Sequence, residues 1–326
     1  MILLSRRLVL CATMTAAALA ALPAAAADYP TRPIKVIVPY PPGGSNDILT
    51  RLVGDHLQQA WGQPIVAENK PGAAGNLGAD LVAKSPPDGY TLVMAPIPVA
   101  AVNVSLYKNL PYDPIRDFAP VAMVSQAPNV LVVKADSPIR TVKDLVDKAR
   151  ANPGKLNYAT PGAGTSLHLA SALFTHKAGV QIQHIPYRGN TAVLDAILKG
   201  EVDMAFDSIQ QAVAQHKAGA VRALAVTSPQ RWPALADVPT MAEAGVPGVE
   251  VMAWFTFLAP AKTPPDVVAK LNAEINRGLM LPDSKAKLDA LGMMPTPMTP
   301  AELGRYMVAE RDRWAETIKA ANITVE

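Results

Sequence analysis

The chain has 326 residues, of which 50% are hydrophobic and 17% charged, with 30 Lys and Arg against 27 Asp and Glu. This length predicts two domains or one large α/β unit, and the composition excludes an intrinsically disordered chain. A net charge of +3 is too small for an electrostatic nucleic-acid binder, and a single cysteine excludes a disulfide framework or a thiolate metal site.

Residues 1–27 have the three parts of a secretory signal. Two arginines precede an apolar stretch over 8–22, and small residues over 24–27 supply a cleavage site. We therefore expect export to the periplasm with cleavage near Ala27, by either the Sec or the twin-arginine route. A transmembrane anchor is disfavoured because Ala and Thr dilute the apolar stretch, which ends at Pro23.

Removal of this segment changes the composition of the mature chain. It takes away two arginines, no acid, and the only cysteine, Cys11. Lipidation of Cys11 is disfavoured because it lies early in the apolar stretch, after the bulky Leu10. The mature protein is expected to be nearly neutral and free of cysteine.

Strand and helix patterns alternate along the first part of the mature chain. The apolar run 34–38 predicts a buried parallel strand, and the spacing of apolar residues over 48–57 predicts a helix. Further strands are expected at 65–67 and 91–95, with a short helix through Leu81 and Val82 between them. This alternation predicts an α/β fold with a mostly parallel sheet.

The same pattern restarts after about residue 127. Helices are expected from a capping box at Thr141 to about 153 and over 166–178. The expected strands lie at 130–133, 156–160, 181–186, 202–206 and 221–226.

Two amphipathic helices are expected near the end of the chain. Thr263-Pro264-Pro265-Asp266 and Thr299-Pro300-Ala301-Glu302 each supply an N-cap, a proline at the first helical position and an acid at the third. We expect these helices to return to the first half. The predicted domains are therefore lobe 1, from 28–125 and 251–326, and lobe 2, from 126–250.

Each half contains a glycine-rich loop between a strand and a helix, Pro41–Asp47 in the first and Pro161–Ser166 in the second. Glycine lets backbone N–H groups approach a ligand, and the following helix N-terminus offers unpaired donors and a partial positive charge. Two such loops facing one another would hold a small anion without Lys or Arg. Each loop is also compatible with an ordinary strand-to-helix turn.

Other functional motifs are missing from the sequence. Leu167 stands where the third glycine of a dinucleotide-binding fingerprint belongs, and neither loop contains the Gly-Lys-Ser/Thr of a phosphate-binding loop. No Gly-x-Ser-x-Gly elbow and no His-Glu-x-x-His pair occurs. We therefore expect no cofactor, no metal and no catalytic residues.

Several polar residues follow predicted strands. Asp207 comes directly after the strand 202–206, where ligands bind in open α/β sheets, and it is equally suited to be the N-cap of the next helix. Tyr40 and Tyr187 also end strands and either border a ligand or close the core edge. His168 lies in the first turn after Ser166.

The segments that contain these features form a recognisable set. They are Tyr29–Ile34, Val38–Asp47 with Arg51, Glu68–Gly78, Pro87–Tyr90, Gly164–Leu169, Pro186–Gly189 and Gly200–Asp203. With them the mature chain resembles, over nearly its whole length, the substrate-binding receptors of tripartite tricarboxylate transporters, also called the Bug family. Two departures, Tyr40 where phenylalanine is common and Asn46 at a variable position, concern the identity of the ligand.

This resemblance implies a monomeric, two-lobed periplasmic binding protein of the Venus flytrap type. Such a protein closes on a small carboxylate and delivers it to membrane components of the transporter, without nucleic acid and without chemistry. The contacts expected from lobe 1 are Tyr40, Pro42, Gly43, Gly44, Ser45, Asn46, Asp47, Ala73, Ala74, Gly75 and Pro96. Those expected from lobe 2 are Gly164, Thr165, Ser166, His168, Tyr187 and Asp207.

Two other functions remain open at this point. The same binding residues would serve a protein read by a periplasmic sensor instead of a transporter. An enzyme that uses His168 or Asp207 as acid or base is disfavoured because the sequence offers no nucleophile–base pair.

Overall fold

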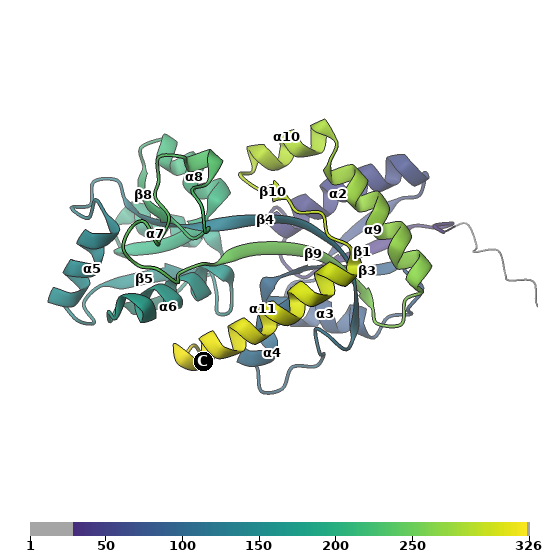
Figure 1. Cartoon of the computed structure of the whole chain (residues 1–326), viewed down its shortest axis with the longest axis horizontal. Coiled ribbons are helices and arrows are strands. Elements are labelled where there is room, and N and C mark those ends of the chain that lie inside the picture. Colours follow the sequence, from purple (N-terminus) through teal and green to yellow (C-terminus); the bar gives the residue numbers. More distant parts are fainter. Residues whose placement is uncertain (1–28, 325–326) are drawn as a thin grey trace, which may run out of the picture. The chain divides into compact units, whose positions relative to one another are not determined.

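The computed structural model describes residues 29–324, and Figure 1 shows their arrangement. The predicted signal segment 1–27, with Cys11, lies outside the described residues. From Arg32 onward the chain forms one unit, to which the description below applies.

The first sheet has a parallel core. Strand β1 (Ile34–Val38) lies between β2 (Ile65–Asn69) and β3 (Thr91–Pro96) and is parallel to both. Helices α2 (Ser45–Trp61) and α3 (Asn76–Ala83) connect them, as crossover helices between parallel strands do. The predicted strands and helices of this region are confirmed, with α2 longer at both ends.

The second sheet repeats this plan. Strand β5 (Asn157–Thr160) is parallel to β6 (Gln183–Pro186) and β7 (Met204–Ser208). The other elements of this part are α5 (Val142–Ala151), α6 (Ser166–Ala178), α7 (Asn190–Lys199), α8 (Ile209–Lys217), β8 (Val221–Val226) and the short η4 (Pro233–Leu235). The α/β class and the capping box of α5 at Thr141 are confirmed.

Two long strands join the sheets (Figure 1). Strand β4 (Phe118–Lys134) pairs antiparallel with β9 (Met252–Pro260) over residues 118–128 and with β7 and β8 over residues 129–134. The sequence analysis expected only 130–133 of β4 and missed β9. Prolines and shifts of register interrupt the pattern of residues 118–128, and the strand is completed by a partner far away in the sequence.

The chain ends in three helices and a short strand: α9 (Pro265–Leu279), α10 (Pro282–Ala290), β10 (Met294–Pro295) and α11 (Pro300–Ala320). Helix α9 packs against α2 and β4, so it returns to the first half as expected. Helix α11 packs against β4, η3 (Pro98–Val102) and α4 (Asn103–Leu106).

One of the two predicted helix caps is correct. Thr299 and Glu302 form the reciprocal capping box of α11. The cap predicted at Thr263 is wrong, because Pro264 is the N-cap of α9. The Oγ1 of Thr263 donates to the carbonyl of Pro260 at 2.8 Å. The threonine therefore closes the turn after β9 and leaves the helix to begin one residue later than predicted.

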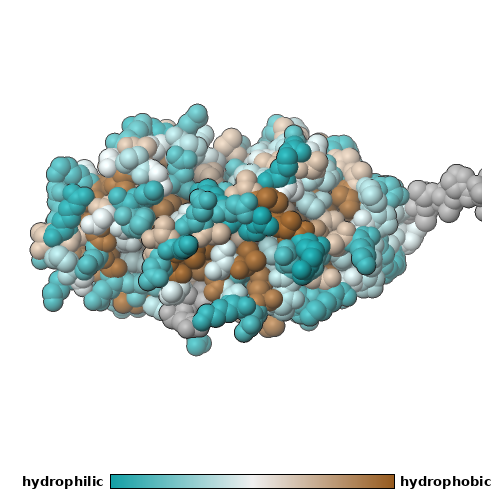
Figure 2. Space-filling model, turned by 60° about the horizontal axis from the view of Figure 1, so that its bottom comes forward, coloured by the Kyte–Doolittle hydropathy of each residue, from teal (hydrophilic) through white to brown (hydrophobic). Residues whose placement is uncertain are grey.

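The surface is mixed in polarity. Figure 2 shows hydrophobic areas between hydrophilic side chains on the face that it presents. The large hydrophobic side chains that remain exposed are Val66, Leu77, Leu81, Met280, Leu281 and Met294. Among residues 29–324, no helix combines the length and the hydropathy needed to cross a membrane.

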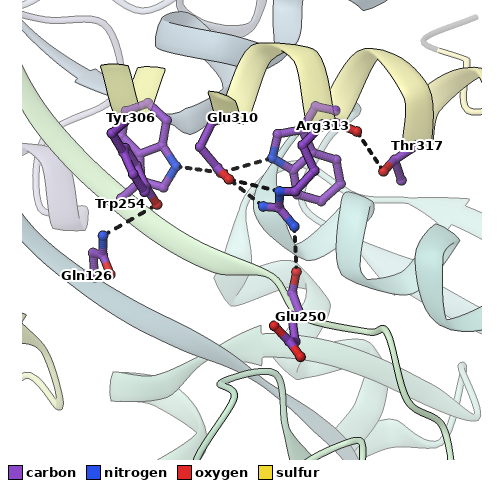
Figure 3. A network of polar contacts seen from close by, with 8 residues as sticks. Gln126, Glu250, Trp254, Tyr306, Glu310, Arg313 and Thr317 are labelled. Carbon is purple, nitrogen blue, oxygen red and sulfur yellow. Dashed lines mark hydrogen bonds and ion pairs between the residues drawn. The ribbon is translucent and has the colours of Figure 1, made fainter. Parts of the chain in front are cut away.

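A polar network ties α11 to the strand β9 (Figure 3). Glu310 is 8% exposed, and its Oε2 accepts hydrogen bonds from the indole N–H of Trp254 at 3.1 Å and of Trp314 at 3.2 Å. Arg313 donates to both carboxylate oxygens and, through Nη1, to the carbonyl of Glu250 at 3.0 Å. One buried carboxylate thus connects the last helix with the region where the chain returns from the second sheet.

This network predicts the effect of Glu310→Ala. The substitution leaves two indole donors and the Nε and Nη2 donors of Arg313 without their acceptor, so it should lower the free energy of unfolding by roughly 2–4 kcal/mol. Urea unfolding measures this, with Glu316→Ala at an exposed position of the same helix as the control. Equal stability of the two variants would contradict the role of the network.

Candidate functional site

The first predicted loop is held by an internal carboxylate. Asp47 is 5% exposed and accepts hydrogen bonds from the Gly43 N–H at 3.1 Å, from Arg51, and from Asn69 Nδ2 at 3.2 Å. Burial alone would raise the pKa of Asp47, but these hydrogen bonds outweigh it and lower the pKa. The carboxylate stays ionised and shapes the loop.

The helix that follows this loop, α2, has backbone N–H groups in its first turn that can donate to a ligand. Its N-cap is Gly44, and among residues 29–324 no side chain caps the first turn. Ser45 and Asn46 open α2, so their N–H groups lie at the positive end of the helix. The Oδ1 atom of Asn46 is buried and has no hydrogen-bond partner among residues 29–324.

The second predicted segment of lobe 1 has an unusual backbone. Ala73, Ala74 and Gly75 all have positive φ, at 47°, 55° and 91°. This conformation is unfavourable for alanine and persists where the surroundings hold it. Here the hydroxyl of Tyr40 donates to the carbonyl of Ala74 at 3.1 Å, and a Cβ on Gly75 would lie 2.8 Å from Val99.

An amide network stands behind this segment. Asn103 Nδ2 donates to Asn76 Oδ1 at 2.6 Å and to the carbonyl of Ala74 at 3.3 Å. The hydroxyl of Tyr112 also donates to Asn76 Oδ1, at 3.1 Å. Asn76 and Asn103 are buried, and Asn103 was not among the predicted contacts.

The loop of the second half begins α6 with a side-chain cap. Thr165 Oγ1 accepts from the His168 N–H at 3.3 Å and donates to the carbonyl of Gly162 at 2.9 Å. Ser166 Oγ donates to Asn129 Oδ1 at 3.2 Å. Asn129 lies in β4 where the pairing changes from β9 to β7 and β8, so this hydrogen bond links the loop to the strand shared by both sheets.

His168 is part of the loop's internal structure. It is 4% exposed, and its Nδ1 accepts the Gly164 N–H at 3.1 Å. Since a backbone N–H can only donate, the proton of the neutral ring is on Nε2. The ring stacks on His184 at 4.6 Å between centroids, and burial together with His184 lowers the pKa of His168 to about 4.

Asp207 is a buried carboxyl group on β7. It is 3% exposed, and its Oδ1 accepts the Ser208 N–H at 2.7 Å. Burial raises the pKa of Asp207 to about 7. The N-cap interpretation of this residue is wrong, because Ser208 is the N-cap of α8 and no side chain caps that helix.

The remaining predicted contacts lie at strand ends. Pro96 is the last residue of β3 and is buried. Tyr187 follows β6, and its N–H donates to the carbonyl of Thr160 at 2.8 Å. Pro42 lies on the exposed part of the first loop.

The loop of the second half touches an element that the sequence analysis did not single out. A Cβ on Gly164 would lie 2.9 Å from Leu106 Cδ1 and 3.4 Å from Asn103 Oδ1, both on α4. Helix α4 follows the first sheet, so this contact brings the two halves of the candidate site together. The sequence does contain a signal for these residues, because a polar residue beside an apolar run needs a hydrogen-bond partner when it is buried. Asn103 directly follows the apolar run 98–102, and Asn129 directly precedes the run 130–133.

The geometry suits backbone recognition of a small anion by loops that internal side chains hold in place. Among the described residues, no group of three or more His, Cys, Asp and Glu could hold a metal ion.

Comparison with known proteins gives the family. Residues 49–323 match the model of the tripartite tricarboxylate transporter family receptor. The chain belongs to this family of solute-binding receptors.

Individual relatives agree with this assignment. Protein BugT of Bordetella pertussis is 37% identical over 306 residues, which cover 92% of each chain. The structure of Rpa4515 from R. palustris with adipate is 38% identical, covers 91% of this chain and 99% of that one, and has a TM-score of 0.85. MatC of Rhodopseudomonas palustris, with bound malate, is 34% identical over 89% of this chain and 100% of that one, with a TM-score of 0.81.

These comparisons confirm the Bug-family resemblance and the periplasmic-binding-protein fold. The family is one of receptors and not of enzymes.

The contact at Gly164 predicts a loss of ligand affinity in Gly164→Ala. A methyl group there would press on Leu106 and hold the loop away from α4, which should weaken ligand binding about tenfold, or about 1.4 kcal/mol. Gly162→Ala is the matched control, because Gly162 also has positive φ but has no atom within 4 Å of its Cβ position. Titration calorimetry with the ligand compares the two. Similar affinity losses would show that backbone strain, and not the contact, is responsible.

The two buried titratable groups predict opposite effects of pH on stability. His168 has its pKa lowered from 6.5 to about 4, so its stabilising contribution is complete above pH 6.5 and is lost as pH falls toward 4. Asp207 has its pKa raised from 3.8 to about 7, so its contribution is complete below pH 3.8 and is lost as pH rises toward 7. In the wild type the two contributions oppose one another over the same range.

Asp207→Asn should therefore expose the histidine contribution. The free energy of unfolding of this variant should fall more steeply than that of the wild type between pH 7 and pH 4.5, by roughly 2–4 kcal/mol. Urea unfolding at the two pH values measures it, and Asp195→Asn at an exposed position of α7 is the control. An unchanged pH dependence in Asp207→Asn would refute the opposing titrations.

Proposed function

We propose that this protein is exported to the periplasm, captures a small carboxylate between two lobes, and delivers it to the membrane components of a tripartite tricarboxylate transporter. It acts as a monomer and does no chemistry on the ligand. The two lobes correspond to the two sheets, with the chain crossing in β4 near Pro128 and Asn129 and returning at the start of β9.

The N-terminus of α2 is the observation that carries this proposal. Gly43 and Gly44 precede it without a Cβ, no side chain of the described residues caps it, and Asp47 accepts the Gly43 N–H within the loop. A carboxylate placed there would accept hydrogen bonds from the N–H groups of the first turn, and the positive end of the helix would stabilise its negative charge. That relatives of similar structure hold adipate and malate supports the same class of ligand here.

Contacts from the second half complete the proposed site. Thr165 and His168 shape the second loop, Ser166 connects it to β4, and Gly164 brings it against α4. Ligand binding would shift the two lobes toward this contact by its higher affinity for the closed arrangement. The internal role of His168 Nδ1 favours binding over acid–base chemistry at this residue.

Titration calorimetry with a panel of aliphatic mono- and dicarboxylates, including malate and adipate, tests the proposal. At least one acid should bind one-to-one and, at a hundred times its dissociation constant, should raise the free energy of unfolding by about 2.7 kcal/mol. Gly164→Ala should bind the same acid more weakly.

One combination of results would refute the proposal. It fails if no acid of the panel binds and native mass spectrometry of the purified protein detects no small acid. Delivery is tested separately, by uptake of the bound acid in cells with and without the membrane components. A receptor that binds but supports no uptake would favour the sensor alternative.

A further inference from the structure

In the side-chain amide of Asn103, the nitrogen makes two hydrogen bonds and the oxygen makes none within the described residues. The residue is 0% exposed, at the start of α4. Its Nδ2 donates to the carbonyl of Ala74 at 3.3 Å and to Asn76 Oδ1 at 2.6 Å. A backbone carbonyl can only accept, so the orientation of the amide is determined and Oδ1 points away from Ala74.

The unpaired oxygen lies at the contact between the two halves of the candidate site. Asn103 Oδ1 has no hydrogen-bond partner among residues 29–324, although it is buried. The Cβ position of Gly164 is 3.4 Å away. The Gly164 N–H is not available to it, because that group donates to His168 Nδ1 at 3.1 Å.

A buried acceptor without a donor is unfavourable, and native proteins rarely keep one without a reason. Because the Gly164 N–H is already used, a donor group on a molecule bound between the halves would satisfy this oxygen. A carboxylate group has no donor when ionised, whereas a hydroxyl or an ammonium group on the same molecule has.

We propose that Asn103 is a specificity-determining residue whose Oδ1 accepts a hydrogen bond from a hydroxyl or amino group of the bound acid. The protein then prefers hydroxy- or amino-carboxylates to the same acids without that group. This inference rests on the proposed function, because it presumes that a carboxylate binds between the lobes. The α2 N-terminus would bind the carboxylate, and Asn103 would recognise a second group of the same ligand.

The chain contains a close match for Asn103 that serves as a control. Asn276 on α9 also donates through Nδ2, to Asn272 Oδ1 at 3.2 Å and to the carbonyl of Met298 at 3.1 Å, and its buried Oδ1 is also unpaired among the described residues. Helix α9 packs against α2 and β4. The two residues therefore share a hydrogen-bonding pattern but differ in position.

Calorimetric titration of matched acids tests the proposal. The probes are succinate, malate and aspartate, which differ only in a hydrogen, a hydroxyl or an amino group, together with adipate and 2-aminoadipate. In at least one series the wild type should bind a donor-bearing acid about tenfold or more tightly than the plain acid. In Asn103→Leu this ratio should fall close to one, and in Asn276→Leu it should not change.

The ratio of two affinities on one protein is insensitive to a general loss of folded protein. If Asn103→Leu does not fold, Asn103→Ala gives the same comparison, and a wild-type ratio near one already overturns the inference. The inference is overturned if the plain acids bind as tightly as their donor-bearing counterparts, or if the preference persists without the Asn103 amide; the receptor function then stands. If no acid of either series or of the wider panel binds, the proposed function fails and the inference fails with it.

Discussion

The antiparallel pairing of β4 with β9 is the interaction on which the rest of the structure depends. Strand β4 is 17 residues long and belongs to both sheets, because its first part pairs with β9 and its last part with β7 and β8. Each sheet has its own parallel core, and β4 is the strand that both share. The residues where β4 changes its pairing from β9 to β7 and β8, above all Asn129, therefore link the two sheets.

The side chains around the loops shape the backbone and leave its donors for a ligand. Asp47 is occupied with Gly43, Arg51 and Asn69, and His168 Nδ1 with the Gly164 N–H. A chain with a net charge of only +3 can still attract an anion in this way, because helix N-termini supply positive potential without a cationic side chain. The low net charge and the carboxylate ligand of the proposal are thus compatible.

His168 and Asp207 are buried titratable groups of the second half, and burial shifts their pKa values in opposite directions. It lowers the pKa of His168 to about 4 and raises that of Asp207 to about 7, so both groups favour their neutral forms. Near neutral pH the histidine is uncharged and the carboxyl is close to its midpoint.

How much the sequence reveals differs between local and long-range features. The helix over 166–178, the capping boxes at Thr141 and Thr299 and the strand of 34–38 depend on neighbours within a few residues, and all were predictable. The cap at Thr263 was misplaced because α9 begins one residue later, with Pro264 as its N-cap, while the Thr263 hydroxyl closes the preceding turn onto the carbonyl of Pro260. The loops predicted to bind the ligand were recognised from their glycines and from the family resemblance.

By itself the sequence determined the α/β class, the family and the two glycine-rich loops, because these follow from periodicity and from short segments of recognisable composition. Only the tertiary structure decided that β4 and β9 join the sheets, that α4 meets the loop at Gly164, and that Asn103 keeps an unpaired buried oxygen there. These features depend on contacts between residues more than twenty-five positions apart, and local patterns of hydrophobicity contain no information about which distant donor or acceptor a side chain will meet.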